Sequence, residues 1–339
     1  MKKSDFFALF LQKNIDLDIS NYQKDFISYL ESKKWVKEPA NLYEPIEYIL
    51  KLGGKRMRPV LTLMAADIFS GAYQKAMPAA LAIEVFHNFT LIHDDIMDDA
   101  PLRRGKDTVH EKWNLNTGIL SGDAMLILAY QYFENYEPVI FQKLAKLFSK
   151  TALEVCDGQQ LDVDFETRSD VTIDEYINMI RLKTSVLVAA ALKMGAFVSN
   201  TTDENANLIY DFGLNLGLAF QLQDDYLDAF GDPATFGKQV GGDIIENKKT
   251  FLYLKSLEVS NEEDRSKLEF YFNQKLEDNS YKITEVLRIF ERNDIPILIK
   301  EQIKKYTEKA FKTLFLINIS EEKKEILKRF GLSLMNRSV

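Results

Sequence analysis

The stretch PAALAIEVFHNFTLIHDDIMDD, residues 78–99, decides the fold. Apolar residues such as Leu81, Val85 and Phe89 recur in it at the spacing of one face of an α-helix. Pro78 fits the first turn of a helix, and a further proline shortly after the stretch cannot continue it. Its 22 residues would span about 33 Å as a helix. We therefore expect one long, largely apolar helix whose last turn is acidic.

A second long helix is expected to end in the same way. Thr201 and Glu204 have the spacing of a capping box, and apolar residues follow at helical spacing to about Ala229. Gly213 and Gly217 lie four residues apart within it, so they share a face on which another helix can approach closely. Both long helices thus carry acidic residues at their C-terminal ends.

The remainder of the chain is also expected to be helical. Only 15 glycines and 8 prolines interrupt 339 residues, so turn signals are sparse. Helical periodicity covers about 118–134, 137–163 and 173–198, and amphipathic helices follow Asp243. No run alternates with a period of two, and no Ser/Gly/Pro-rich linker divides the chain. The sequence predicts an all-α fold with a single domain over residues 1–339.

Composition excludes several classes of function. The net charge of −8 includes no long block of like charge, so no nucleic-acid partner is expected. The single cysteine, Cys156, cannot form an intramolecular disulfide and fits a cytoplasmic protein. The longest uncharged run, 212–223, is too short to span a membrane, so no integral membrane contact is expected. The three histidines His87, His93 and His110 are too few to favour a histidine-built zinc site.

Two acidic clusters are the strongest functional signal. Residues 94–98 read DDIMD and residues 224–228 read DDYLD, so both have the form Asp-Asp-x-x-Asp. Residues four apart share a helix face, so each cluster presents two carboxylates to one point. Either cluster alone is also compatible with a solvated acidic surface. Two copies at the ends of two apolar helices favour sites for Mg²⁺, which is usually held by a few carboxylates together with substrate phosphates.

Basic residues accompany both clusters. The segment GGKRMRP, 53–59, precedes the first cluster, Arg103 and Arg104 follow it, and Lys238 and Lys248 follow the second. Taken singly, each could be an ordinary surface charge. Arginine binds phosphate oxygens in a bidentate manner, and lysine binds them as a point charge. Their position beside candidate Mg²⁺ sites therefore predicts a substrate with several phosphates.

Taken in order, these motifs resemble the trans-isoprenyl diphosphate synthases, or polyprenyl synthetases, most of all those that make geranylgeranyl or farnesyl diphosphate. The resemblance covers about residues 52–250, whereas the helices expected over 251–339 match only in helical character. Its motifs are GGKRMRP at 53–59, HNFTLIHDDIMDDAPLRRG at 87–105, DGQQLD at 157–162, KTS at 183–185, FQLQDDYLD at 220–228 and FGKQVGGDIIENKKT at 236–250. It implies an isoprenoid synthase-like helical bundle around a deep central cavity.

The resemblance implies a role for each candidate residue. The ligands of Mg²⁺, three ions in each active site, would be Asp94, Asp95, Asp98, Asp224, Asp225 and Asp228. The allylic diphosphate would be bound by Arg103, Lys183, Lys238 and Lys248. The pocket for isopentenyl diphosphate would contain Lys55, Arg58, His87 and Arg104, while Thr184 and Gln221 would place oxygens near the developing cation.

The implied reaction is a Mg²⁺-dependent prenyl transfer. Neutralising the charge that grows on the leaving pyrophosphate lets the allylic C–O bond ionise, and the double bond of isopentenyl diphosphate then attacks the cation. The released pyrophosphate would accept the proton, and water must be excluded because it would quench the cation.

Product length is predicted from the residues before Asp94. Phe89 matches the family position at which an aromatic ring forms a floor, and Thr90 beside it is small. The resemblance favours a C20 product, with C15 next and longer chains as the alternative. Phe89 is also compatible with an ordinary core residue, in which case Phe86 would be the floor.

Two rival functions and an oligomeric state complete the expectations. A class I terpene cyclase also ionises an allylic diphosphate, but it usually lacks a second Asp-Asp-x-x-Asp motif and needs no second diphosphate pocket. A silent partner subunit should have lost metal ligands, and all six aspartates are present here. The resemblance implies a homodimer, for which the helices at 118–134 and 137–163 could supply the interface.

Overall fold

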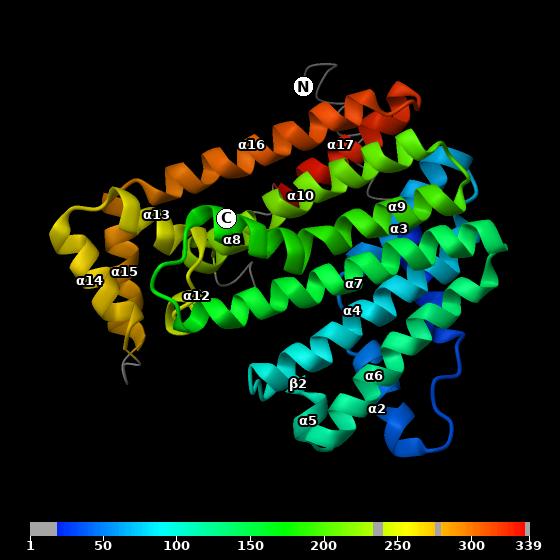
Figure 1. Cartoon of the computed structure of the whole chain (residues 1–339), viewed down its shortest axis with the longest axis horizontal. Helices are drawn as coiled ribbons and strands as arrows, with labels where there is room; N and C mark the ends of the chain where they lie inside the picture. Colours follow the sequence, from blue (N-terminus) through cyan, green and yellow to red (C-terminus); the bar gives the residue numbers. More distant parts are fainter. Residues whose placement is uncertain (1–18, 233–239, 275–278, 336–339) are drawn as a thin grey trace, which may run out of the picture. The chain divides into compact units, whose positions relative to one another are not determined.

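The computed structural model describes residues 19–232, 240–274 and 279–335, which are almost wholly helical (Figure 1). The predicted all-α fold is therefore confirmed. The chain forms two compact units: unit 1 comprises Met1–Ser149 and Ala190–Asn207, and unit 2 comprises Lys150–Ala189 and Leu208–Val339. Two other expectations, the single domain over residues 1–339 and the deep central cavity, stay predictions. No helix among the described residues is long and apolar enough to cross a membrane.

Unit 1 contains the first long helix and the segments around it. After a helix over residues 19–31 come α2 (Ala40–Lys51), α3 (Met57–Ser70), η1 (Tyr73–Ala76), α4 (Met77–Met97), β1 (Leu102–Arg103), β2 (Lys106–Asp107), α5 (Val109–Lys112), α6 (Leu115–Gln131) and η2 (Tyr132–Asn135). The long helices α7 (Pro138–Thr167), α9 (Val186–Val198) and α10 (Asp203–Phe230) each contribute residues to both units.

The core of unit 1 is built around α4. This helix packs along α6 and beside α3, as Figure 1 shows. The ring of Phe148 lies 5.0 Å from that of Phe86 and 5.3 Å from that of Phe133, and all three are buried. Helix α4 is therefore fixed along its length, and it holds its acidic C-terminal end in a defined position.

The ends of the two long helices differ slightly from expectation. Helix α4 stops at Met97 rather than at Asp99, because Asp99 takes a left-handed conformation with φ of 48°, which aspartate tolerates better than most residues. Thr201 and Glu204 do not form the predicted capping box. The hydroxyl of Thr202 instead accepts from the Asn205 N–H at 3.2 Å.

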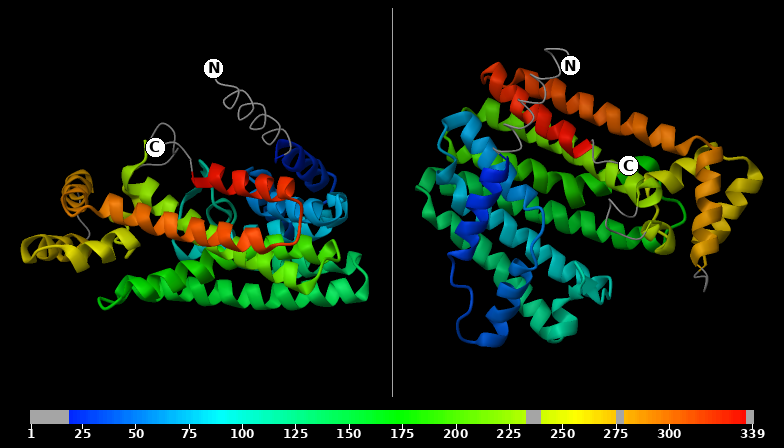
Figure 2. Two further views of the ribbon diagram at one scale, coloured as in Figure 1. Left: turned by 90° about the horizontal axis from the view of Figure 1, so that it is seen from above. Right: turned by 180° about the vertical axis from the view of Figure 1, so that it is seen from behind.

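Unit 2 contains the second acidic cluster and the C-terminal helices. It comprises the remainder of α7, α9 and α10 with α8 (Ile173–Ile180), η3 (Arg181–Ser185), α12 (Gly242–Ile245), α13 (Phe251–Val259), α14 (Glu262–Phe272), α15 (Asn279–Arg292), α16 (Ile295–Leu316) and α17 (Glu321–Met335). Helix α17 lies beside α16 (Figure 2). The close approach predicted at Gly217 is confirmed, because a Cβ there would lie 2.8 Å from Ser185 Cα.

Two local features were not predicted. The expected continuous helix over 173–198 is interrupted at η3, which is a π-helical turn between α8 and α9. A short antiparallel hairpin, in which Arg103 pairs with Lys106, joins α4 to α5. Both irregular segments carry residues that the sequence assigns to the site.

Candidate active site

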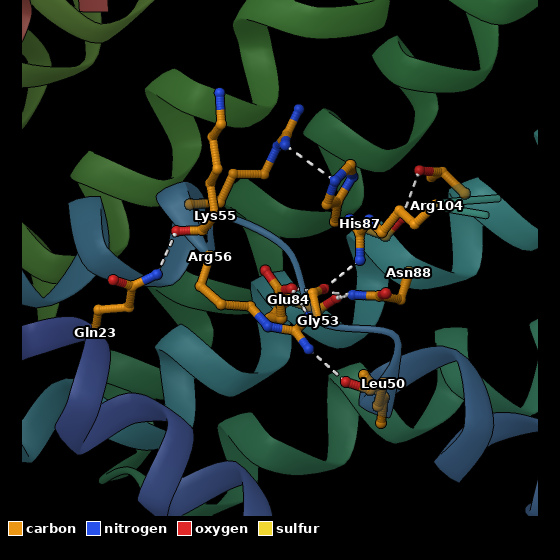
Figure 3. A network of polar contacts seen from close by, with 11 residues as sticks. Gln23, Leu50, Gly53, Lys55, Arg56, Glu84, His87, Asn88 and Arg104 are labelled. Carbon is orange, nitrogen blue, oxygen red and sulfur yellow. Dashed lines mark hydrogen bonds and ion pairs between the residues drawn. The ribbon is translucent and has the colours of Figure 1, made fainter. Parts of the chain in front are cut away.

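Four basic residues of unit 1, which we call the basic cluster, come from three parts of the chain: Lys55, Arg58, His87 and Arg104. Figure 3 labels Lys55, His87 and Arg104. Lys55 lies between α2 and α3, and Arg58 is in the first turn of α3. His87 lies in α4, and Arg104 lies at the tip of the β1–β2 hairpin. Arg58 Nη1 is 3.1 Å from His87 Nε2. The structure thus joins residues that are up to 49 positions apart in sequence.

A buried ion pair holds the segment that carries Lys55 and Arg58. Arg56 between them turns inward, opposite to Lys55, and donates to the carboxylate of Glu84 and to the carbonyl of Leu50 (Figure 3). Only 4 % of each side chain of the Arg56–Glu84 pair is exposed. Breaking such a pair by removing one partner typically costs about 3–5 kcal/mol. Arg56 and Glu84 therefore position the basic cluster without belonging to it.

Arg104 is held by the glycine pair at the start of the same segment. Its guanidinium donates to the carbonyl of Gly53. Gly54 has φ of 120°, and a Cβ there would lie 2.7 Å from Arg104 Nη2. The backbone conformation at position 54 thus favours glycine, and a side chain there would displace the guanidinium of Arg104.

The basic cluster concentrates positive charge around His87. Burial, followed by the charges of Arg58, Arg104 and Arg103, lowers the pKa of His87 well below its usual value. Burial, followed by the charge of Arg56, also lowers the pKa of Arg104. The neutral His87 ring can therefore accept the Arg58 hydrogen bond. Such a concentration of cations favours a multiply charged anion.

The first acidic cluster has one inner and two outer carboxylates. Asp95 is buried, and Arg103 Nε lies 2.8 Å from both of its oxygens. Asp98 is exposed and Asp94 is partly exposed, and the Asp98 N–H donates to the Asp94 carbonyl at 2.9 Å. The pair Asp95 and Arg103 is thus already charge-balanced, which leaves the outer carboxylates as the stronger candidates for metal ligands.

The candidate floor residues differ in burial. Phe86 is 1 % exposed and packs within the ring cluster of the core. Phe89 is only partly buried, and its ring lies 5.5 Å from that of Phe86 and 4.8 Å from that of His93. The hydroxyl of Thr90 donates to the His87 carbonyl at 2.8 Å. Of the two rings, Phe89 is therefore the more accessible one.

In unit 2, the π-helical turn η3 presents Lys183 and Thr184. Gly158 in α7 lets the turn approach closely, since a Cβ there would lie 2.3 Å from the backbone nitrogen of Lys183. Lys183 Nζ pairs with Asp162 Oδ2 at 2.5 Å. Turns of this kind are frequent at functional sites.

A chain of hydrogen bonds links η3 to the second acidic cluster. Thr184 Oγ1 donates to Gln221 Oε1 at 3.1 Å, and Gln221 Nε2 donates to Asp225 Oδ1 at 3.1 Å. The hydroxyl of the buried Tyr176 donates to the other oxygen of Asp225. Asp225 is itself buried, and it is oriented by neutral donors rather than by a cation.

Acidic residues crowd around Asp225. The backbone N–H of Asp243 donates to Asp228 Oδ2 at 3.0 Å, and the N–H of Gly241 donates to the Asp228 carbonyl at 2.7 Å. Burial, followed by the charge of Asp243, raises the pKa of Asp225 well above its usual value. We call Asp162, Asp225 and Asp243 the acidic pocket; together with Lys183, Thr184 and Gln221 they line a cavity of about 260 Å³.

Of the remaining candidates, Lys248 also lines this cavity and pairs with Glu246 at 2.9 Å. Asp224 lies in α10 and is partly exposed. Lys238 lies outside the described residues, so its predicted role is not tested.

Several residues that position the site were not assigned from the sequence. They are Arg56, Glu84, Asp162, Tyr176 and Asp243. Arg56, Asp162 and Asp243 stand inside the sequence motifs, so the motifs offered a signal for them. Tyr176 and Glu84 lie 49 and 28 residues from their partners, and no local pattern marks them.

Comparisons with known proteins agree with this geometry. Residues 39–290 match the family model described as polyprenyl synthetase. The chain is 42 % identical over 225 residues to a geranylgeranyl diphosphate synthase of Methanosarcina mazei, with 66 % of this chain and 69 % of that protein covered. It is 41 % identical over 237 residues to a geranylfarnesyl diphosphate synthase of Natronomonas pharaonis, with 65 % and 70 % covered.

A solved structure is also similar over nearly the whole chain. A crystal structure of a geranylgeranyl pyrophosphate synthase matches with a TM-score of 0.91 at 54 % sequence identity. The match covers 95 % of this chain and 99 % of the other. The similarity therefore includes the C-terminal helices, which the sequence motifs do not reach.

Proposed function

The chain belongs to the polyprenyl synthetase family, and we propose that it condenses isopentenyl diphosphate with dimethylallyl, geranyl or farnesyl diphosphate to give a short-chain, all-trans prenyl diphosphate. The relatives are prenyl diphosphate synthases, so the reaction class is prenyl transfer. The C20 product is favoured, with C15 next.

The basic cluster is the observation that carries the proposal. A prenyl diphosphate synthase needs a second diphosphate site that binds isopentenyl diphosphate as an intact nucleophile. Arg58, Arg104 and Lys55 supply cations there, and burial together with the neighbouring arginines lowers the pKa of His87. Such a concentration of cations favours a diphosphate. A class I terpene cyclase would have no use for such a cluster.

The acidic residues fit a divalent cation. Burial, followed by the charge of Asp243, raises the pKa of Asp225, and hard oxygen donors are the ligands that Mg²⁺ prefers. We assign the Mg²⁺ sites to Asp94 and Asp98 and to Asp224 and Asp228, with Asp95 and Asp225 as the buried members of each motif. When bound, Mg²⁺ would neutralise charge on the allylic diphosphate as its C–O bond ionises.

The chain's own side chains orient and protect the reacting groups. Lys183, fixed by Asp162, would contribute a cation to the allylic diphosphate, together with Arg103, Lys238 and Lys248. Thr184 and Gln221, fixed by the hydrogen bonds that end at Asp225, would direct oxygens toward the allylic cation. The released pyrophosphate would take the proton, because the nearby carboxylates are engaged.

Product length would be set by Phe89, whose ring is more accessible than that of Phe86. Removing the ring by Phe89→Ala is expected to lengthen the product, while Phe86→Ala, the matched change one turn away, should leave the product length unchanged. A longer product from Phe86→Ala alone would identify Phe86 as the floor.

We also propose a cytoplasmic homodimer. Leu120 and Ile127 in α6 and Val139 in α7 are apolar and at least 59 % exposed, which is typical of a surface that another subunit covers. Sedimentation analysis should show a dimer for the wild type and a shift toward monomer for Leu120→Glu. A monomeric wild type would contradict this part of the proposal.

The deciding experiment supplies the purified protein with Mg²⁺, labelled isopentenyl diphosphate and each allylic primer in turn, and measures the chain length of the products. We expect Mg²⁺-dependent turnover that stops at C20. Products beyond C25 would overturn the role of Phe89 but keep the reaction, whereas cyclised hydrocarbon or no turnover would overturn the function.

A further inference from the structure

A third cluster of potential ligands lies at the base of the β1–β2 hairpin, and it begins at the residue directly after the first Asp-Asp-x-x-Asp motif. It consists of Asp99, His110 and Glu111, which we call the hairpin-base cluster. One ligand atom from each residue lies within 4.8 Å of the others. Asp99 precedes the hairpin, and His110 and Glu111 follow it in α5. The cluster therefore brackets the segment that carries Arg103 and Arg104.

The environment of His110 points to a missing ligand. Only 9 % of its side chain is exposed, and in the part of the chain that the structure describes neither ring nitrogen has a hydrogen-bond partner. A carboxylate oxygen of Glu111 is 3.8 Å from His110 Nε2, which is too far for a hydrogen bond. A buried polar group without a partner costs about 1–3 kcal/mol, and a bound ion can supply the partner that such a group lacks.

We propose that the hairpin-base cluster binds a divalent transition-metal ion of the Zn²⁺ class. An imidazole with two carboxylates suits Zn²⁺ or Co²⁺ better than Mg²⁺, which favours oxygen ligands alone. Metal–ligand bonds of about 2.0–2.2 Å require the ligand atoms to draw somewhat closer than they are here. Asp99 and Glu111 are exposed and can rotate to do so, while the largely buried His110 stays in place.

The ion would close the loop that presents two arginines of the active site. Two hydrogen bonds already pin the hairpin base: Thr108 Oγ1 donates to the Ala100 carbonyl at 2.8 Å, and the Thr108 N–H donates to the Pro101 carbonyl at 3.1 Å. A metal bridge between Asp99 and His110 would add a third link. Because an ion that binds only the folded state stabilises it, the bound metal should raise the melting temperature. Binding of the ion does not depend on which reaction the protein catalyses.

The test is a titration of the full-length protein with Co²⁺ in the presence of excess Mg²⁺, followed by visible absorption. We expect one saturable Co²⁺ per chain. His110→Gln and Asp99→Asn should each weaken binding at least about tenfold. Asp107→Asn makes the same change of charge on the same hairpin outside the cluster, so it should bind Co²⁺ like the wild type.

Two further measurements separate the alternatives. Asp98→Asn should retain the Co²⁺ site, and if it abolishes binding, the ion belongs to the aspartate motif and the proposal is overturned. Absence of saturable binding, or unchanged binding in His110→Gln and Asp99→Asn, also overturns it. Because the Asp99 side chain is exposed, Asp99→Asn should fold like the wild type. Zn²⁺ should raise the melting temperature of the wild type and of Asp107→Asn but not of Asp99→Asn.

Discussion

The basic cluster of unit 1 and the acidic pocket of unit 2 gather residues of opposite charge. In the first, burial and neighbouring arginines lower the pKa of His87. In the second, burial and the charge of Asp243 raise the pKa of Asp225. Each region therefore pushes a titratable group toward its neutral form. The first offers cations to an anion directly, whereas the second offers carboxylates that suit a metal cation beside Lys183 and Lys248.

This difference separates two ways of binding a diphosphate. The basic cluster offers arginine and lysine donors, so isopentenyl diphosphate needs no metal there. In the acidic pocket, Lys183 and Lys248 are already paired with Asp162 and Glu246, so a diphosphate there should need Mg²⁺ as well. The two substrates of the proposed reaction should therefore differ in their dependence on metal and on particular side chains.

The largest effect is expected at an outer carboxylate. Asp224→Asn should lower kcat at least about 1000-fold, because it removes a proposed metal ligand from the site of ionisation. Affinity for isopentenyl diphosphate should change little. Steady-state turnover at saturating substrate, together with equilibrium binding of isopentenyl diphosphate, checks both parts. A kcat within tenfold of the wild type would contradict the assignment.

The two inner carboxylates, Asp95 and Asp225, should differ in how much stability is lost when their charge is removed. Asp95→Asn deprives Arg103 of its partner and should destabilise the metal-free protein by about 2–4 kcal/mol. Asp225→Asn keeps one oxygen to accept from Gln221, and the Tyr176 hydroxyl can turn to accept from the new amide. The change also relieves repulsion from Asp243, so its stability should lie within about 1 kcal/mol of the wild type. Urea unfolding in the presence of EDTA measures both free energies of unfolding. Equal losses of stability in the two variants would contradict the proposed difference between Asp95 and Asp225.

A smaller and more selective effect is expected in the basic cluster. Arg58→Met should weaken isopentenyl diphosphate binding about 10- to 100-fold, the loss typical of a charge-assisted contact. The KM for the allylic primer should stay close to that of the wild type. Initial rates with each substrate varied in turn provide the test. A change confined to the allylic KM would show that the two sites have been assigned the wrong way round.

The mildest effect should appear as a pH dependence of stability. The pKa of His87 is lowered in the folded protein. Below about pH 6.5, His87 therefore binds a proton in the unfolded chain but not in the folded chain. Stability should therefore fall by up to about 1.4 kcal/mol more between pH 7.5 and 5.5 than it does in His87→Gln. Urea unfolding across this pH range measures the difference. Parallel profiles of stability against pH for the two proteins would show that His87 binds its proton equally well in the folded state, and would contradict the prediction.

The sequence predicted local geometry better than tertiary pairing. The shared face of Asp94 and Asp98 follows from helical spacing alone, and α4 ends two residues before its predicted end. The π-helical turn at η3 could not be predicted, because it accompanies the close packing of Lys183 on Gly158 of another helix. The pairing of Tyr176 with Asp225 likewise depends on how α8 meets α10. Such contacts are decided by packing across long sequence separations.

We propose that one diphosphate site is built from protein cations and that the other requires metal. Calorimetric titration with isopentenyl diphosphate and with a non-reactive allylic diphosphate analogue, each with Mg²⁺ and with EDTA, tests it most directly. We expect isopentenyl diphosphate to bind with similar affinity in both conditions, and the analogue to bind only with Mg²⁺. Loss of isopentenyl diphosphate binding in EDTA, or retention of the analogue, would contradict it.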